Sequence, residues 1–403
     1  MRTILGRFTI KKLGLIVMSL FVLSLLATFI NGSVLIAGAN EPYENTNDKL
    51  AIKDVIIKFY DTKYQSLSVL QEKDISIFWK TDDNPGYKLE AASLSIDVNH
   101  RKIQPLDLRF EKYVLKMDFE KIDVFNDKAE VKVVENSQIY QNASPDVCSE
   151  LRDEHVIKLE KINGKWLIIS DNSNDETKKD LLLRIATGKT INEAKKEILE
   201  NSKHEVMTYN QQKMNKSNKQ YNDQDVGPLT VSPMSLQGYN RDSAVQYALD
   251  WSWPGYRNTP TWGNYTGQGG DCTNFTSQCL YAGGIPFDTV GNPNYNQRWF
   301  WYSYSNTTPP WTGVNPFWDY ALNDTGYGLH AGTTNVWNAI RGDIAQLYSG
   351  STGSHSLFIN NAYTDGQGNR HIFICCHETD RRNYEISNYP SSKRYLKIYG
   401  WYN

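Results

Sequence analysis

Cysteine is scarce in this chain, net charge is nearly absent, and no internal repeat is visible. Its 43 lysines and arginines almost balance 45 aspartates and glutamates, and a net charge of −2 gives no reason to expect a nucleic-acid partner. Five cysteines are an odd number and a poor basis for a disulfide framework. The composition therefore disfavours a disulfide-stabilised scaffold and leaves thiol chemistry open. The five are Cys148, Cys272, Cys279, Cys375 and Cys376.

Long apolar runs are also missing, with one exception near the amino terminus. An uncharged, mostly apolar stretch, Leu13–Ala37, follows four basic residues and ends in Ala37-Gly38-Ala39. This arrangement is typical of a secretory signal, here residues 1–39, cleaved before Asn40. The stretch is also long enough to span a bilayer, so an uncleaved anchor stays open as the alternative. Either way we expect a secreted or cell-surface protein that meets the membrane only through this segment.

Residues 45–171 are predicted to form an α+β domain, a helix followed by a curved antiparallel sheet. Between residues 48 and 70 apolar side chains recur on one helical stripe. From residue 113 to 119 the period changes to two, and Asn163-Gly164 between two later runs is a strong hairpin signal. The pattern resembles the cone-shaped SnoaL-like, or nuclear-transport-factor-like, fold. Two histidines here are expected to be structural or on the surface: His100 and His155.

Residues 172–235 are predicted to be a helical and polar connection. The first part is charged and helix-prone, and from Tyr209 to Leu236 the composition turns to Asn, Gln, Lys and Ser. Too little of this second part is apolar to offset the entropy of ordering it. We therefore expect a flexible linker there, which limited proteolysis would cut first.

The second half is organised around the stretch Gly269–Gly284. A helix-compatible run starts at Cys272, and Phe275 and Cys279 follow on one face. Gly283-Gly284 ends the run, because glycine adopts the left-handed conformation without strain. The positive end of a helix favours a thiolate, so Cys272 is a candidate nucleophile. The alternative, a buried structural cysteine, is the prediction for Cys279.

A thiolate nucleophile needs a base within hydrogen-bond reach and a group that orients the base. His355 starts an apolar strand just after a turn, where its ring can project from the sheet. His377 ends the next strand and is followed by Glu378 and Asp380. Taken singly, each histidine is better explained by a solvated or structural role. A thiol on a helix and imidazoles on neighbouring strands together favour a catalytic set.

Aromatic residues are concentrated in the second half, where nine of the eleven tryptophans lie beyond residue 250. Residues 286–337 are a loop-rich insert dense in Trp, Tyr, Asn, Pro and Gly. Such an insert either packs as a core or lines a substrate groove. The sequence leaves both open.

At these residues the chain resembles the family called putative amidase domain of secreted bacterial proteins, within the wider NlpC-type, papain-like cysteine hydrolases. The resemblance covers about residues 237–403 and none of the first half. The cysteine stretch is the specific signal for the family. The other motifs are weak alone and support the resemblance mainly because they occur in the same order. The matching pieces are Tyr239-Asn240-Arg241, Asn264-Tyr265, Gly270-Asp271-Cys272-Thr273-Asn274-Phe275, Ser277-Gln278-Cys279, Gly342-Asp343 and His355-Ser356.

The resemblance implies a second α+β domain over residues 236–403, in which a helix carrying the cysteine packs on a sheet carrying the histidine. It assigns Cys272 as the nucleophile and His355 as the base. The third catalytic position then falls at the end of the next strand. The candidates there, in order, are His377, Asp380, Asn388 and Glu378.

The backbone N–H of Cys272 is the natural donor to an oxyanion, and Gln268 or Asn264 is a candidate for a second donor. No organic cofactor or metal is implied. His377, Glu378 and Asp380 together are a weak basis for a cation site. The adjacent Cys375-Cys376 departs from the family pattern and is predicted to be two apolar strand residues.

These features predict a secreted cysteine-dependent amidohydrolase that cleaves amide bonds of a peptide or amide substrate, plausibly peptidoglycan. One alternative is a cell-surface protein that binds a glycan or peptide in an aromatic groove without catalysis. Another is a transglutaminase-like acyl transferase with the same catalytic residues. The scissile bond and the oligomeric state are not specified by the sequence.

Overall fold

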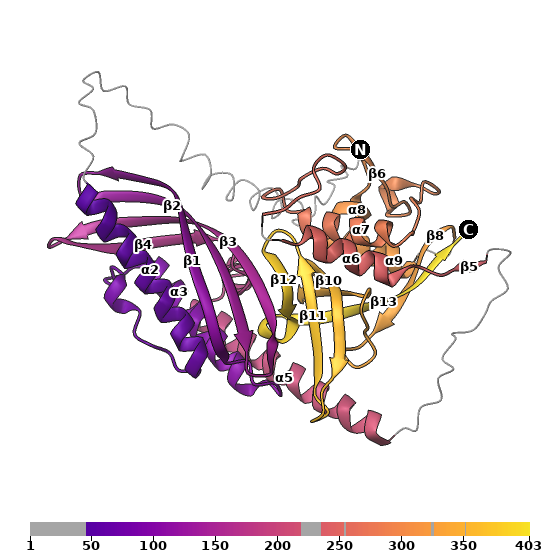
Figure 1. Cartoon of the computed structure of the whole chain (residues 1–403), viewed down its shortest axis with the longest axis horizontal. Helices are drawn as coiled ribbons and strands as arrows, with labels where there is room; N and C mark the ends of the chain where they lie inside the picture. Colours follow the sequence, from indigo (N-terminus) through magenta and orange to yellow (C-terminus); the bar gives the residue numbers. More distant parts are fainter. Residues whose placement is uncertain (1–45, 219–234, 254, 324–325, 351) are drawn as a thin grey trace, which may run out of the picture. The chain divides into compact units, whose positions relative to one another are not determined.

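Five stretches of the chain are described by the computed structural model (Figure 1): residues 46–218, 235–253, 255–323, 326–350 and 352–403. The predicted signal, residues 1–39, and most of the predicted flexible linker lie outside them. Within these stretches no helix is both long and apolar enough to cross a membrane. From Asn47 on, the described residues form one compact unit, which contains the sheets and the helices packed on them.

The first half consists of two helices against a long antiparallel sheet, which confirms the predicted helix-plus-sheet arrangement. The stripe predicted on the first helix is enclosed, with Ile56 and Phe59 fully buried. The second helix was not predicted; the Asn84 side chain caps its first amides and Pro85 opens it. The elements are α2 (Thr46–Val69), α3 (Pro85–Ile103), β1 (Phe110–Phe125), β2 (Lys128–Gln141), β3 (Ser144–Ile162) and β4 (Lys165–Ser173).

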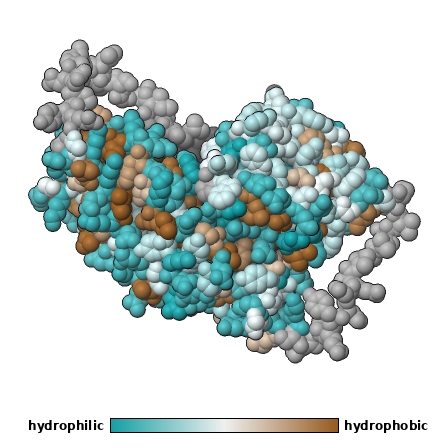
Figure 2. Space-filling view, viewed as in Figure 1, coloured by the Kyte–Doolittle hydropathy of each residue, from teal (hydrophilic) through white to brown (hydrophobic). Residues whose placement is uncertain are grey.

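Tight turns set the register of this sheet. Asn126 turns β1 into β2 with φ of 53°, and Asn163 and Gly164 join β3 to β4 with φ of 51° and 80°. Both central positions of such a turn need positive φ, which is why the Asn-Gly pair predicted this hairpin. The outward face of β1 leaves Val114 and Phe125 exposed, and Figure 2 shows hydrophobic patches over this half of the surface.

The second half packs helices against one face of further antiparallel strands (Figure 1), so both halves are α+β as predicted. Phe275 of the cysteine helix and Phe358 of a central strand share one buried cluster. The helices are α6 (Arg241–Trp251), α7 (Asp271–Ala282), α8 (Pro309–Thr312) and α9 (Val314–Asn323). The strands are β5 (Leu236–Gln237), β6 (Trp301–Ser303), β7 (Asn306–Thr307), β8 (Gly328–Thr334), β9 (Ile344–Ser349), β10 (Thr352–Thr364), β11 (Arg370–Cys376), β12 (Asp380–Glu385) and β13 (Ser392–Tyr402).

The two halves share one sheet. β12, a strand that the sequence did not reveal, pairs with β3 so that Asp380 lies opposite Arg152. Arg381 forms a buried ion pair with Asp153, with its two terminal nitrogens 3.1 and 2.8 Å from the carboxylate oxygens. One hydrophobic cluster also draws side chains from both halves. The boundary expected at residue 236 therefore does not separate two independent cores.

The connection between the halves is helical, with α4 (Glu176–Ala186) and α5 (Ile191–Asn218). Helix α5 continues into the stretch where the sequence predicted a flexible linker. Tyr209 explains the difference, because its ring packs on Trp337 with centroids 4.8 Å apart. Its hydroxyl also accepts a hydrogen bond of 2.7 Å from the Arg370 backbone. Tertiary packing thus orders residues whose composition alone is polar.

The aromatic insert is mainly a packed core. Trp299 and Trp311 are fully buried, and their ring centroids lie 4.8 Å apart. Trp262 stacks on Trp311 at 5.2 Å and is 8% exposed. Of the two interpretations left open by the sequence, the buried tryptophans favour packing over a groove.

The two histidines of the first half are buried. His155 lies 3.0 Å from Asp171 and 3.6 Å from Glu135. Burial alone would lower the pKa of His155, but the two carboxylates raise it to about 10. His100 bonds the Ser202 hydroxyl on α5 and the Ser387 carbonyl near the end of the chain. Both are structural, so the surface alternative is ruled out.

Candidate active site

Cys272 stands at the start of α7, as predicted. The helix begins at Asp271, so the backbone N–H of Cys272 has no acceptor within the helix. Gly284 follows the helix with φ of 93°, the left-handed conformation expected at its end. Cys279 is fully buried on the inner face. The sequence around the thiol therefore folds locally as its glycine and apolar pattern predicted.

The thiol of Cys272 is buried, with 4% of the residue exposed. Burial raises the pKa of Cys272 to about 11, although the backbone of Ser356 and the Thr273 hydroxyl, 3.8 Å from the sulfur, act to lower it. The sequence predicted a thiolate at the positive end of the helix. In the structure burial is the largest influence on the pKa of the thiol, and it favours the neutral form over the predicted thiolate.

His355 lies on β10 close to the thiol, because the next residue along the strand, Ser356, is the one whose backbone reaches the sulfur. The His355 ring is 1% exposed, and its Nε2 lies 3.3 Å from the Thr379 hydroxyl. Burial, together with the positive charges of Lys179 and Arg381, holds the pKa of His355 well below its usual value. The imidazole is therefore neutral.

The thiol and the imidazole do not touch in the described part of the chain, where no hydrogen bond joins Cys272 to His355. Side chains alternate along β10, and Ser356 points toward α7, with its hydroxyl 2.9 Å from that of Thr273. His355 shares the opposite face with Leu357, which packs in the cluster common to both halves. The strand places Ser356, and not His355, toward Cys272. For the thiol and the imidazole to meet, the His355 side chain must rotate.

His377 lies beneath the start of α7 and away from His355. Its Nδ1 is 3.2 Å from an Asp271 carboxylate oxygen and its Nε2 is 2.8 Å from the Trp251 carbonyl. The ring stacks on Phe275 at 3.9 Å between centroids. Nε2 is thus bonded to the main chain and Nδ1 faces the Asp271 carboxylate. No hydrogen bond joins His377 to His355 in the described part of the chain, so the orienting role of His377 stays a prediction.

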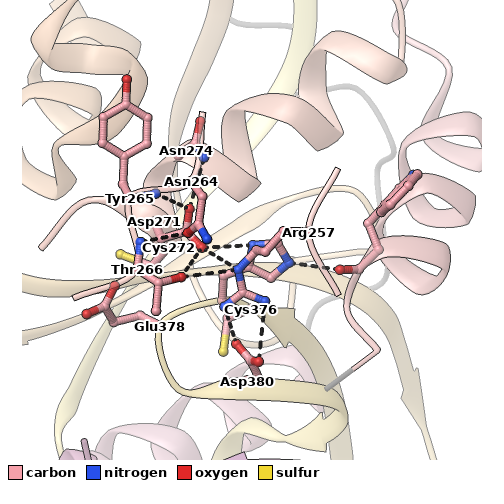
Figure 3. Close-up of polar contacts among 12 residues, drawn as sticks. Arg257, Asn264, Tyr265, Thr266, Asp271, Cys272, Asn274, Cys376, Glu378 and Asp380 are labelled. Atoms are coloured by element: carbon pink, nitrogen blue, oxygen red, sulfur yellow. Dashed lines mark hydrogen bonds and ion pairs between the residues drawn. The ribbon is translucent and has the colours of Figure 1, made fainter. Parts of the chain in front are cut away.

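Asp380 is linked to His377 through Asp271 and Arg257, and Figure 3 shows Arg257 between the two aspartates. Arg257 bridges two carboxylates, with Nη2 2.6 Å from Asp380 and Nε 2.7 Å from Asp271. The backbone amide of Gly255 donates a further hydrogen bond of 2.8 Å to Asp380. Asp380 thus anchors the loop before α7 and does not contact His355.

Asp271 is the centre of this network. Burial acts to raise the pKa of Asp271, but the hydrogen bond and charge of His377 and the charge of Arg257 hold it well below its usual range. Its carboxylate also accepts from the Tyr265 amide at 3.1 Å and from the Asn274 side chain at 3.0 Å. Asp271 immediately precedes Cys272, so these bonds fix the first turn that carries the thiol.

Thr379 is the residue that the sequence analysis missed. It lies between the first two candidates for the third position, and among the described residues its side chain is the one bonded to the ring of His355. Glu378 before it has a φ of 81°, which breaks the alternation that the strand pattern assumed. Asn388, another candidate, bonds Arg101 and Gln141 instead.

The structure places both candidates for a side-chain oxyanion donor, Asn264 and Gln268, on the loop before α7. Asn264 accepts a hydrogen bond of 2.9 Å from the Thr266 amide and forms a local turn. Gln268 is exposed on the loop before the helix. The free backbone N–H of Cys272 is left as the donor.

The remaining thiols are structural or peripheral. Cys375 packs in the cluster beneath α7, and Cys376 packs in the cluster shared by both halves. The two therefore point to opposite faces of β11, as expected of apolar strand residues. Cys148 alone is partly exposed among the five, and all are free. In the described stretches no group of three His, Cys, Asp or Glu side chains is placed to hold a metal ion.

Residues 238–400 match the family described as "Putative amidase domain". Two curated relatives are both from Bacillus subtilis. The uncharacterized protein YhbB is 38% identical over 94 residues, which is 23% of this chain and 27% of that protein. The uncharacterized protein YjcM is 24% identical over 211 residues, 50% of this chain and 47% of that protein. The chain thus spans less than half the length of either relative, and the family match supports a hydrolase of amides at a coarse level.

Solved structures resemble part of the chain. One is described as a putative scytalone dehydratase from Novosphingobium aromaticivorans, at 13% identity over 32% of this chain and 86% of that one, with a TM-score of 0.22. Another is the Kfla4162 protein from Kribbella flavida, at 9% identity over 31% of this chain and 90% of that one, with a TM-score of 0.22. Scores this low carry no conclusion about activity.

Proposed function

We propose that this protein hydrolyses amides through a thioester on Cys272. One observation carries the proposal: within the segment that matches the amidase family, the thiol stands at a helix start with the backbone beside His355 against its sulfur. A nucleophile needs a base within hydrogen-bond reach, so the proposal requires the His355 ring to approach the sulfur. The papain-like arrangement, a cysteine helix packed on a histidine-bearing sheet, is part of the proposal.

The reaction starts from a neutral thiol and a neutral imidazole. After the His355 ring turns from Thr379 toward the sulfur, the Cys272 proton passes to the imidazole as the sulfur attacks the amide carbonyl. The carbon–nitrogen bond then breaks, and the imidazolium protonates the departing amine. Next, the neutral imidazole takes a proton from water, whose oxygen attacks the thioester. The acid product leaves and the thiol is restored.

Charge that develops on the carbonyl oxygen meets the backbone N–H of Cys272. This donor has no competing acceptor in the helix, and it is aligned with the helix dipole. A single donor of this kind is worth about 3 kcal/mol in the transition state. The carbonyl therefore binds over the first turn of α7.

Peptidoglycan is the proposed substrate, because the predicted export signal would deliver the protein to the cell wall. The test is digestion of purified peptidoglycan, followed by mass spectrometry of the released fragments. Hydrolysis predicts paired fragments with a new amine and a new carboxylate. Products in which an added amine replaces the carboxylate would show acyl transfer instead. Retention of intact peptidoglycan without cleavage would support the binding protein.

The pH dependence of kcat/KM should reflect the neutral His355. An ordinary imidazole loses its basic form as pH falls through about 6.5. Because burial lowers the pKa of His355, the ring stays neutral below that pH, and the acid limb should fall well below pH 6.5. Protonating the unfolded chain meanwhile lowers the free energy of unfolding as pH falls below 6.5. A limb centred at or above 6.5 in folded protein contradicts the assignment.

Because the His355 ring must leave Thr379 to reach the sulfur, replacing Thr379 with valine should raise kcat about fivefold, the value of one hydrogen bond, and leave KM unchanged. The hydroxyl is the contact seen on the His355 ring, so its loss should also displace the acid limb of the pH profile. Thr379→Ser keeps the hydroxyl and should restore both. If His377→Gln shifts the limb and Thr379→Val does not, the third position belongs to His377.

A further inference from the structure

Two carboxylates, one from the second half and one from the helical connection, act on the thiol. Glu378 lies in the turn between β11 and β12, and Figure 3 shows its side chain beside Cys272. Glu176 is the first residue of α4, and it is 7% exposed. Both charges act on the thiol and disfavour its ionisation. The space next to the sulfur is therefore acidic.

Glu378 is held in a strained backbone conformation. Its φ of 81° is unusual for a residue with a side chain, and such strain persists where the surroundings enforce it. The Asn174 side chain, just before α4, donates a hydrogen bond of 2.6 Å to the Glu378 carbonyl. The carboxylate is only partly satisfied, because the Gly267 backbone bonds it while its Oε2 is buried and has no hydrogen-bond partner among the described residues.

A lysine side chain already occupies this acidic space. The Lys179 ammonium, one turn along α4, lies 3.0 Å from Glu176. Burial acts to lower the pKa of Lys179, but the charge of Glu176 and, more weakly, that of Glu378 raise it, so the ammonium is held in its charged form. Its side chain is 37% exposed, which places it at the border between the site and solvent. A partly exposed side chain exchanges more easily than a buried one.

We propose that Glu378 and Glu176 receive a positively charged group of the substrate, which takes the place of the Lys179 ammonium beside Cys272. The substrate class is then an amide whose acyl part carries an ammonium near the scissile carbonyl, as in a peptide with a free amino group. This proposal rests on the proposed hydrolase function. It goes beyond it by naming the charge that the site selects.

The acidic site can be tested without any substrate, through the rate at which reagents of different charge modify Cys272. The probes are three methanethiosulfonates: the cationic aminoethyl, the neutral methyl and the anionic sulfonatoethyl reagents. A Cys148→Ser chain removes the partly exposed thiol, and peptide mass spectrometry at pH 8 identifies the modified residue. The cationic reagent should react fastest and the anionic one slowest.

Glu378→Gln should reduce the ratio of cationic to neutral rates about fivefold, the effect of one nearby charge. Lys179→Gln removes the competing ammonium and should raise that ratio. Glu130→Gln on β2, 45% exposed and remote in the sheet, is the matched control and should change nothing. Equal rates for the three reagents, or a ratio insensitive to Glu378→Gln, overturn the proposal.

A pair of substrates separates this proposal from the hydrolase itself. A short peptide amide with a free amino group should be cleaved with at least fivefold higher kcat/KM than its N-acetylated form, and Glu378→Gln should remove the difference. Equal cleavage of both overturns the charge selectivity and leaves the hydrolase standing. Charge-selective modification of Cys272 without cleavage of either peptide, or of peptidoglycan, overturns the hydrolase and leaves the acidic site standing.

Discussion

Replacing Cys272 with alanine should reduce amide hydrolysis roughly a thousandfold or more, because no other group can form the thioester. The substitution removes one sulfur from a buried position and should cost only about 1 kcal/mol of stability. The loss should appear in kcat with saturating substrate, since binding does not need the sulfur. Initial rates on the substrate found by digestion provide the measurement.

Cys148→Ala is the matched control, since it removes a thiol that lies on β3 outside the site. It should leave the rate within twofold of the unmodified chain. Thermal unfolding of both variants shows whether the fold is kept. A Cys272→Ala chain that is folded and retains more than a tenth of the activity contradicts the mechanism.

Replacing Asp153 with alanine should destabilise the protein by about 3–5 kcal/mol, because it leaves the Arg381 guanidinium buried without its counter-ion. Arg381 is 5% exposed and Asp153 is 8% exposed, so water cannot replace the lost partner. The pair joins β12 to β3 across the two halves. Both halves should therefore unfold in one transition at a lower denaturant concentration.

The matched control is Asp54→Ala on α2. Asp54 pairs with Lys58 at 2.7 Å, and their side chains are 58% and 62% exposed. An exposed pair of this kind contributes about 0–1 kcal/mol. Chemical denaturation followed by tryptophan fluorescence compares the two variants. Equal small losses, or separate transitions for the two halves, would show that the halves fold independently.

Local pattern was enough to predict the elements that carry the site. Apolar spacing and the closing glycines defined α7, and the apolar strand patterns defined β10, which holds His355, and β11, which ends just before His377. These signals depend on neighbours within a few residues. The same is true of the Asn163-Gly164 hairpin. The position of the nucleophile at a helix start follows from them.

Features that depend on distant contacts were not predictable. The pairing of β12 with β3 joins residues far apart in the chain. The residue pattern within each strand does not indicate which other strand it pairs with. The neutral state of Cys272 follows from its burial, which is a tertiary property. The left-handed backbone at Glu378 orients Thr379 so that its hydroxyl bonds the His355 ring. Positive φ usually occurs at glycine, and the sequence has no glycine at this position to indicate such a turn.

The central claim, that Cys272 forms a thioester during amide hydrolysis, is tested most directly by quenching the reaction in acid during turnover and analysing the protein by peptide mass spectrometry. The account predicts the mass of the substrate's acyl group on the peptide containing Cys272, removed by hydroxylamine and absent from the Cys272→Ala chain. Turnover that proceeds with no acyl group on Cys272, or with the group on another residue, contradicts it.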